Sequence, residues 1–440
     1  MTIPRPSRVT LPAAALAAML AAGCGSTVAG TGVPAAGRTH VRLPLVTSLT
    51  VPGMASWAIV DMGGSSAAYE NFWQLITRRA GTARWTLATP PGVADNGGLV
   101  AASLGGAALV TGVDPSQDLR FSPLATTRDS GAHWTPGLLP AGLASVPSAL
   151  AAGTGGRLLA LTDRGLAEMS APGGASWARL TSLASLAATP AGRSCGLRSL
   201  TAAAFTPSGM PLLAGQCASR GVTGIFAYSG GGWRRAGPAL PAALAQRRVS
   251  VLQLSTAGHR TIALLTAAAP GGAVSLIAAW ANPGGRWALS APLPLNGARV
   301  VSTAADPGAA ARTTSTGTTS TGTTAAAAGT GTTSTGTTAA ATGTAGAGQA
   351  AIPAASTVGV ILSTGLADTI AGPASPWRQL PALPAHAAAL VLGPGPLISA
   401  LAAHGSVLTG WRLAAPAGSR AVAWTRTQVM KVPVPYGSSS

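Results

Sequence analysis

The stretch Thr127-Arg128-Asp129-Ser130-Gly131-Ala132-His133-Trp134 reads Ser/Thr-x-Asp-x-Gly-x-x-Trp and predicts a tight hairpin between two strands. An aspartate in a turn accepts backbone N–H bonds, so Asp129 is expected to hold the turn together. Gly131 stands where such a hairpin needs a positive φ. Trp134 then opens the next strand and offers a large apolar face for packing against a sheet.

Tryptophans recur along the chain at intervals typical of a four-stranded repeat. Aligned on Trp134, they stand at seven positions: Trp85, Trp134, Trp177, Trp233, Trp287, Trp377 and Trp424. Four-stranded blades repeat at ~40–50 residues. The intervals fit this period, two of them slightly long, except the one between Trp287 and Trp377, which contains a low-complexity insert. The sequence therefore predicts an all-β chain folded as a β-propeller of seven four-stranded blades, with six as the alternative count.

The octet resembles the Asp-box, or BNR repeat, of sialidase-like β-propellers, in which the box is the hairpin between the third and fourth strands of a blade. Partial copies stand at 170–177 and 282–287. The resemblance implies a propeller over residues 51–436. It also implies that the box supports the fold and lies away from the usual ligand face. The residues expected to have this structural role are Thr127, Asp129, Gly131 and Trp134.

Short apolar runs separated by Gly/Pro turns begin at Ser56 and fall into seven groups of predicted strands. The innermost strand of the first blade is not evident. The last predicted strand, 421–432, is expected to pair with the open edge of the first blade and so close the ring. Residues 313–349 are Thr, Gly, Ala and Ser almost throughout, carry no charge and are expected to form a disordered insert in blade six, a candidate for O-glycosylation.

Residues 1–23 have the pattern of an export signal. Arg5 and Arg8 precede an apolar segment at 11–22 that is too short to span a membrane. The sequence Leu20-Ala21-Ala22-Gly23-Cys24 resembles a bacterial lipobox, whose cysteine is lipidated on sulfur and becomes the new N-terminus. The alternative is an ordinary secretory signal followed by an incidental cysteine. Residues 24–50 read as a flexible tether.

The lipobox resemblance implies a location at the outer face of the cytoplasmic membrane, in the cell envelope, with the membrane as a partner through lipidated Cys24. Cys195 and Cys217 are the two other cysteines. An even pair in an exported chain is expected to form a disulfide.

The chain is strongly basic, with 28 Lys and Arg against 10 Asp and Glu. The arginines are mostly scattered singly, and no basic run is interleaved with aromatic residues, so nucleic acid is not an expected partner. Affinity for anionic envelope polymers or lipid head groups stays open. The most apolar internal segment, 386–402, is interrupted by Gly-Pro-Gly-Pro at 393–396 and does not predict a membrane span.

The loops between blades and those between the second and third strands of a blade are expected on one face of a propeller, here called the mouth face, where ligands of propellers usually bind. Polar side chains gather in the loops of this face in blades one and two. The candidate ligand-binding residues are Glu70, Asp95, Asn96, Asp114, Asp118 and Arg120. They predict a surface for a polar or cationic ligand; no cofactor is predicted, and a structural or ligand-bridging Ca²⁺ is the alternative left open. Solvated loop residues that keep an apolar chain soluble are the alternative.

Catalytic residues are not evident. Sialidases use an arginine triad, a Tyr–Glu nucleophile pair and an aspartate, but here Tyr69 and Glu70 are adjacent in one loop and the Phe/Tyr-Arg-Ile-Pro motif is absent. The histidines show no metal-ligand spacing, and no cofactor motif occurs. We therefore predict a lipid-anchored binding or assembly module of the cell envelope, whose partner is an unidentified protein or glycan. A sialidase-like glycan hydrolase, or a structural protein held to anionic polymer by its charge, are the alternatives.

Overall fold

The computed structural model describes residues 46–51, 55–62, 72–90, 98–102, 108–112, 123–138, 147–162, 164–171, 176–257, 260–282, 285–305, 358–393, 397–415 and 422–433. These residues belong to one compact unit, His40–Ser440. The predicted signal peptide, the lipidation residue Cys24, most of the predicted tether and the insert at 313–349 lie outside the described residues.

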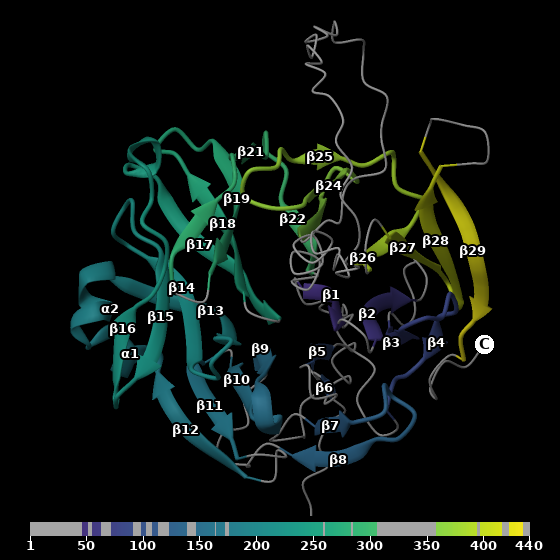
Figure 1. Ribbon diagram of the computed structural model, residues 1–440, viewed down its shortest axis with the longest axis horizontal. Helices are drawn as coiled ribbons and strands as arrows, with labels where there is room; N and C mark the ends of the chain where they lie inside the picture. The colour runs from purple at the N-terminus through teal and green to yellow at the C-terminus, as the bar shows by residue number, and fades with distance from the viewer. Residues whose placement is uncertain are drawn as a thin grey trace, which may run out of the picture. The chain divides into compact units, whose positions relative to one another are not determined.

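The described strands form seven blades, each built from four strands that follow one another in the chain and pair antiparallel (Figure 1). This confirms the β-propeller prediction and the count of seven. Blades 1 to 4 consist of β1 (Val46–Val51), β2 (Ala55–Met62), β3 (Phe72–Arg79) and β4 (Thr86–Leu87); β5 (Gly98–Ala102), β6 (Ala108–Gly112), β7 (Pro123–Thr127) and β8 (Thr135–Leu138); β9 (Pro147–Ala152), β10 (Leu158–Thr162), β11 (Leu166–Ser170) and β12 (Trp177–Ser182); and β13 (Leu197–Phe205), β14 (Pro211–Cys217), β15 (Gly224–Ser229) and β16 (Gly232–Arg235).

The last three blades follow the same plan. They consist of β17 (Arg248–Ala257), β18 (Arg260–Ala268), β19 (Val274–Ala281) and β20 (Trp287–Leu289); β22 (Val300–Ala305), β23 (Val358–Leu362), β24 (Ala367–Ile370) and β25 (Arg378–Gln379); and β26 (Ala387–Leu392), β27 (Ile398–His404), β28 (Val407–Ala414) and β29 (Ala423–Lys431). A short additional strand, β21 (Leu293–Pro294), also pairs with β19. The mouth face holds the connections between blades and between second and third strands. The hairpin face holds the other turns.

Apolar side chains fill the seams between neighbouring blades. Blades 3 and 4 share a core that includes Leu161 and Phe226, and blades 4 and 5 share one that includes Val251 and Ile277. Similar buried clusters join blades 1 and 2, blades 5 and 6, and blades 6 and 7. Alternate side chains of each strand point to opposite faces, so a blade can contribute an apolar face to each of the two seams beside it.

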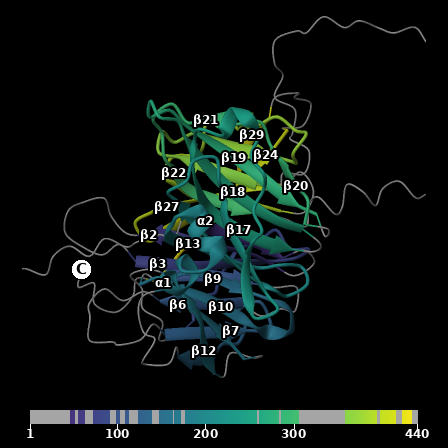
Figure 2. The ribbon, with the colours of Figure 1, turned by 90° about the vertical axis from the view of Figure 1, so that its left-hand side faces the viewer.

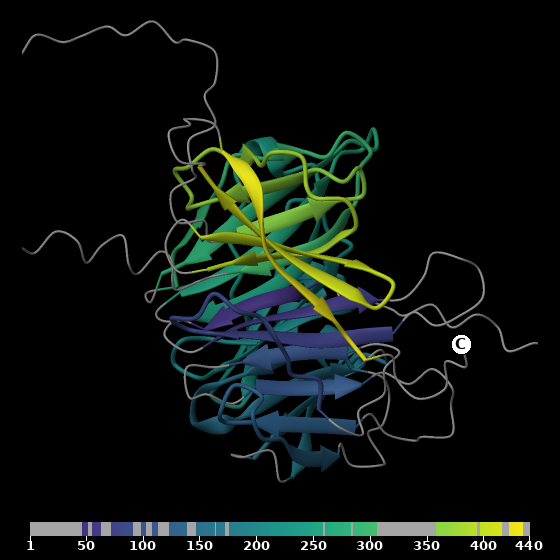
Figure 3. The same cartoon turned by 90° about the vertical axis from the view of Figure 1, so that its right-hand side faces the viewer.

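The first and last blades meet without exchanging a strand. β29 pairs with β28 in its own blade, so the predicted pairing of the C-terminal strand with the first blade is wrong. Apolar residues that include Ile76 and Leu401 fill the seam. Blade 7 lies directly beside blade 1 (Figure 3). The Gln428 amide on β29 bonds the backbone of Trp85: its Nε2 donates to the Trp85 carbonyl at 2.9 Å, and its Oε1 accepts from the Trp85 N–H at 2.8 Å. A side chain thus makes the bonds that a paired strand would make.

The innermost strand of blade 1 is β1, which begins within the stretch expected to be tether. It pairs parallel with β22 of blade 6. Its hydroxyl side chains provide further bonds: Thr47 bonds Ser302 of blade 6, and Ser48 donates to the Leu390 carbonyl of blade 7. The inner strands of blades 1, 6 and 7, which are β1, β22 and β26, are therefore bonded to one another.

Two short helices connect blade 3 to blade 4 beside β13 (Figure 2). They are α1 (Leu183–Ala187) and α2 (Pro190–Cys195), and the sequence analysis did not anticipate them. Hydroxyls cap both: Ser182 accepts from the Ser185 N–H, and Thr189 accepts from the Gly192 N–H. A side chain at Gly192 would clash with the Leu186 carbonyl, which explains the glycine. Within the described ranges, no helix has the length and apolarity to cross a membrane.

Candidate functional site

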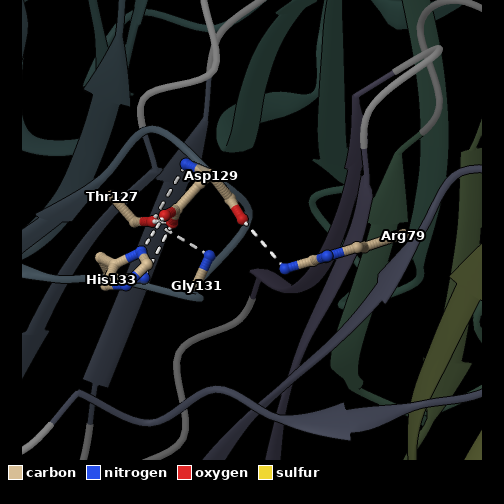
Figure 4. Close-up of polar contacts among 5 residues, drawn as sticks. All are labelled: Arg79, Thr127, Asp129, Gly131 and His133. Carbon is tan, nitrogen blue, oxygen red and sulfur yellow. Dashed lines mark hydrogen bonds and ion pairs between the residues drawn. The ribbon is translucent and has the colours of Figure 1, made fainter.

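The 127–134 hairpin joins β7 to β8, the third and fourth strands of blade 2, and is held by its own side chains (Figure 4). One oxygen of Asp129 accepts from the His133 N–H at 2.9 Å, and the other lies 2.6 Å from His133 Nδ1. Thr127 Oγ1 donates to Asp129 at 2.8 Å and accepts from the Gly131 N–H at 3.0 Å. The His133 N–H, its ring and the Thr127 hydroxyl together hold the pKa of Asp129 well below its usual range.

The same hairpin packs against blade 1. Gly131 has a φ of 87°, as predicted, and a Cβ there would lie 2.9 Å from Ala88 Cβ and 3.5 Å from the Trp57 ring. Trp134 makes an edge contact with Trp57, with ring centroids 6.2 Å apart. Arg79 of blade 1 donates to the Asp129 carbonyl at 3.4 Å. The Asp129 side chain therefore holds the hairpin together, and the Asp129 carbonyl bonds the hairpin to blade 1.

The candidate ligand-binding residues lie outside the described residues. This applies to all six: Glu70, Asp95, Asn96, Asp114, Asp118 and Arg120. Tyr69, considered as part of a sialidase-like pair, also lies outside them. Their grouping on the mouth face stays a prediction.

The described part of the mouth face carries the Cys195–Cys217 disulfide, with the two Cα atoms 5.2 Å apart. Cys195 is the last residue of α2, and Cys217 is the last residue of β14. The disulfide therefore ties the connection between blades 3 and 4 to the C-terminal end of the second strand of blade 4. Both cysteines are buried in the core between these blades. The predicted disulfide is confirmed, and it makes α2 a fixed part of this face.

Glu168 is a buried acid that the sequence analysis did not single out. It lies on β11, fully buried, and neither of its carboxyl oxygens has a hydrogen-bond partner in the part of the chain that the structure describes. Burial raises the pKa of Glu168 to about 7, opposed in part by the cross-strand Arg179. A carboxyl in this position is close to the balance between its neutral and charged forms at neutral pH.

The Glu168 side chain faces blade 2. Its β11 neighbours Ala167 and Met169 pack in the core shared with blade 4, so alternation places Glu168 on the opposite face. That face also holds Leu158, Ala160 and Trp177. The indole N–H of Trp177 is buried and, like the carboxyl, lacks a partner among the described residues.

Arg78 of blade 1 is a second buried ionisable group, and its side chain is basic. It lies on β3 in the seam between blades 1 and 7 and is 7% exposed. Its guanidinium carbon stands 4.7 Å from the centre of the Trp85 ring, and its Nη1 donates to Ser399 Oγ at 3.1 Å. Burial, and then the charge of Arg412, lower the pKa of Arg78 to about 10. Over the described ranges, no cluster of His, Cys, Asp and Glu has the makings of a metal site.

Comparisons with known proteins give a likeness of fold. No protein-family model matches the chain, and no curated protein does. A solved structure of YCF48 bound to D1 peptide is 13% identical, with a TM-score of 0.38, over 90% of this chain and 94% of that one. A protein from Lactobacillus plantarum is 11% identical, with a TM-score of 0.46, over 87% and 97%. The GH74 enzyme of Niastella koreensis is 10% identical, with a TM-score of 0.46, over 88% of this chain and 55% of that one. The blade assignment itself rests on the strand pairing described above.

Proposed function

We propose that the chain is an exported, lipid-anchored β-propeller that acts as a binding or assembly module of the cell envelope. The observation that carries the proposal is the Cys195–Cys217 disulfide. Disulfides persist in oxidising compartments outside the cytoplasm, which fits the export signal expected at 1–23. The third cysteine, Cys24, directly follows that signal, where a lipobox places the lipidated residue.

The fold supports a binding role. Blades packed through apolar seams form a scaffold, and binding residues of such scaffolds sit mainly on the loops. The mouth-face residues Glu70, Asp95, Asn96, Asp114, Asp118 and Arg120 are the proposed ligand surface. The hairpin geometry of Thr127, Asp129, Gly131 and Trp134 supports placing the chain among Asp-box propellers, with these four residues in a structural role.

Fatty-acid labelling tests the anchor. Cells that express the full chain are grown with a clickable palmitate analogue, and the protein is then examined in membrane and soluble fractions. The wild-type chain is expected to carry the label and to sediment with membranes, whereas Cys24→Ala loses the label. Cys195→Ala with Cys217→Ala is the matched cysteine control and retains it. An unlabelled wild-type chain contradicts lipid anchoring.

Capture from the envelope tests the ligand surface. The lipidated chain is used to pull down partners beside a variant with Asp95→Ala and Asp118→Ala, a variant without residues 313–349, and an Arg84→Ala control that alters an exposed charge elsewhere. A partner lost only with the Asp95 and Asp118 variant supports the mouth face. Equal recovery by all four proteins contradicts it.

A further inference from the structure

The seam between blades 1 and 7 places a buried cation where the described chain offers no opposite charge. Arg78 lies over the Trp85 ring and donates to Ser399, a buried serine on β27. In the part of the chain that the structure describes, Arg78 forms no ion pair with a carboxylate. A ring face and a hydroxyl oxygen offset part of the cost of burying a guanidinium group, but they do not neutralise it.

A second cation stands beside the first. Arg412 on β28 is the cross-strand partner of Ser399, so the serine that accepts from Arg78 is also the backbone neighbour of Arg412. Arg412 is exposed, and its charge acts on Arg78. The fold thus holds two arginines close together, one buried and one open to solvent. Like charges repel in this arrangement.

The surrounding backbone leaves room for the buried group. A Cβ at Gly393 would stand 3.2 Å from Arg78 Nη2, tighter than ordinary contact. A Cβ at Gly410 would stand 3.3 Å from Trp85 Cδ1. Glycines at these two positions leave space for the Arg78–Trp85 stack, and a side chain at either would crowd it.

An oxyanion fits the chemistry of this cluster. A guanidinium group presents a planar fork of N–H donors that matches the oxygens of phosphate, sulfate or carboxylate. We propose that Arg78 and Arg412 form an anion-binding site at the seam between the first and last blades, which takes an oxyanion group. Arg78 supplies a buried guanidinium fork and Arg412 supplies an exposed one. The bound anion removes the repulsion between them. The site does not depend on the function proposed above.

Thermal unfolding in different salts tests the site. The purified full chain is unfolded at one ionic strength with chloride as the only anion, and then with phosphate, sulfate or acetate replacing part of the chloride. At least one of the three oxyanions is expected to raise the midpoint and, in titration, to change the fluorescence with saturation. Which of them does so identifies the class of group that binds.

Substitution of the exposed arginine separates binding from folding. Arg412→Gln is expected to unfold at the wild-type temperature or above it in chloride, because a repulsive charge is gone. Its half-saturating oxyanion concentration rises roughly tenfold or more, since one of two forks is lost. Arg378→Gln removes an exposed arginine from β25 and is the matched control, expected to respond like the wild type. Arg78→Lys keeps the charge without the fork and is expected to bind more weakly.

Two results would overturn the proposal. One is a wild-type chain whose midpoint is the same in chloride and in all three oxyanions. The other is an Arg412→Gln chain that responds to oxyanion as strongly as the wild type and the Arg378→Gln control. Either result would leave Arg78 as a fastener between blades and nothing more.

Discussion

The seam between blades 7 and 1 and the seam between blades 2 and 3 each bury one ionisable side chain next to one tryptophan, with different outcomes. Arg78 has the Trp85 ring and the Ser399 hydroxyl, and the Trp85 backbone is bonded by Gln428. Glu168 and the indole N–H of Trp177 have no hydrogen-bond partner in the described residues. Burial lowers the pKa of Arg78 to about 10, which is still well above neutral pH, so the guanidinium keeps its charge. Burial raises the pKa of Glu168 to about 7, so the carboxyl is pushed toward its neutral form.

The largest change in the free energy of unfolding is expected from removing the side chain of Arg78, which has the Trp85 ring and the Ser399 hydroxyl as partners. Arg78→Ala leaves a cavity over Trp85 and removes the bond to Ser399, and is expected to destabilise the protein by roughly 3–4 kcal/mol. Urea unfolding followed by tryptophan fluorescence measures it. Arg84→Ala, an exposed neighbour, should change stability by about 0.5 kcal/mol or less. Equal losses in the two variants would show that Arg78 contributes nothing through its seam.

The next largest effect is the pH dependence of the free energy of unfolding that comes from titration of Glu168. The pKa of Glu168 is about 7 in the folded chain, against an ordinary value of 4.5. A raised folded pKa gives stability that is complete below pH 4.5 and is lost as the pH rises through 7. At ~1.4 kcal/mol per pKa unit, the wild type is expected to lose roughly 2–3 kcal/mol between pH 5 and 8.

Glu168→Gln isolates this contribution, because the amide has the shape of the protonated acid but does not titrate. Its unfolding free energy is expected to match that of the wild type below pH 4.5 and to exceed it at pH 8. Parallel pH profiles for the two chains would mean that Glu168 is solvated or paired in solution. The comparison of the two seams would then fail.

Gln428→Leu tests the closure between the first and last blades. It leaves the Trp85 N–H and carbonyl without the amide that bonds them, at a net cost of roughly 1 kcal/mol for each lost hydrogen bond. A loss of about 2 kcal/mol is therefore expected in urea unfolding. Thr425→Ala on the same strand is the control. A Gln428→Leu chain as stable as the control would assign the closure to apolar packing alone.

The smallest effect is expected at the unpartnered tryptophan. Trp177→Phe loses apolar area but also removes a buried N–H without a bond, so the two terms offset each other to within about 1 kcal/mol. Trp85→Phe loses ring area under Arg78 as well and should cost more. Calorimetry of both variants sharpens the contrast between the seams, and the reverse order of stabilities would contradict it.

The repeat made most of the fold predictable. Strands such as β15 and β19 are short apolar runs between glycine-rich or proline-containing turns, which is the pattern that predicted strands. β1 was missed because an inner strand with Thr47, Ser48 and Thr50 has the composition of a polar linker. The helices α1 and α2 were missed because their caps, Ser182 and Thr189, stand within short Ala- and Leu-rich stretches that also suit strands.

The buried ionisable groups were less accessible to sequence reasoning. Alternation places Arg78 and Glu168 on a definite face of a strand, but their burial depends on what the neighbouring blade offers opposite them. Ser399 lies 321 residues from Arg78 in the chain, and no local pattern connects the two. The predicted ligand surface around Asp95 and Asp118 lies outside the described residues and is still a prediction.

The pairing of β1 with β22 has a consequence for how the chain acquires its structure. Thr47 and Ser302, which bond each other across these strands, are separated by 255 residues. A chain made from its N-terminus must hold the edge of β1 without its partner until five blades and the first strand of the sixth have emerged. Contacts of such high sequence separation slow folding, and an open strand edge invites association with other chains. The first strand of the domain is therefore among the last to be completed.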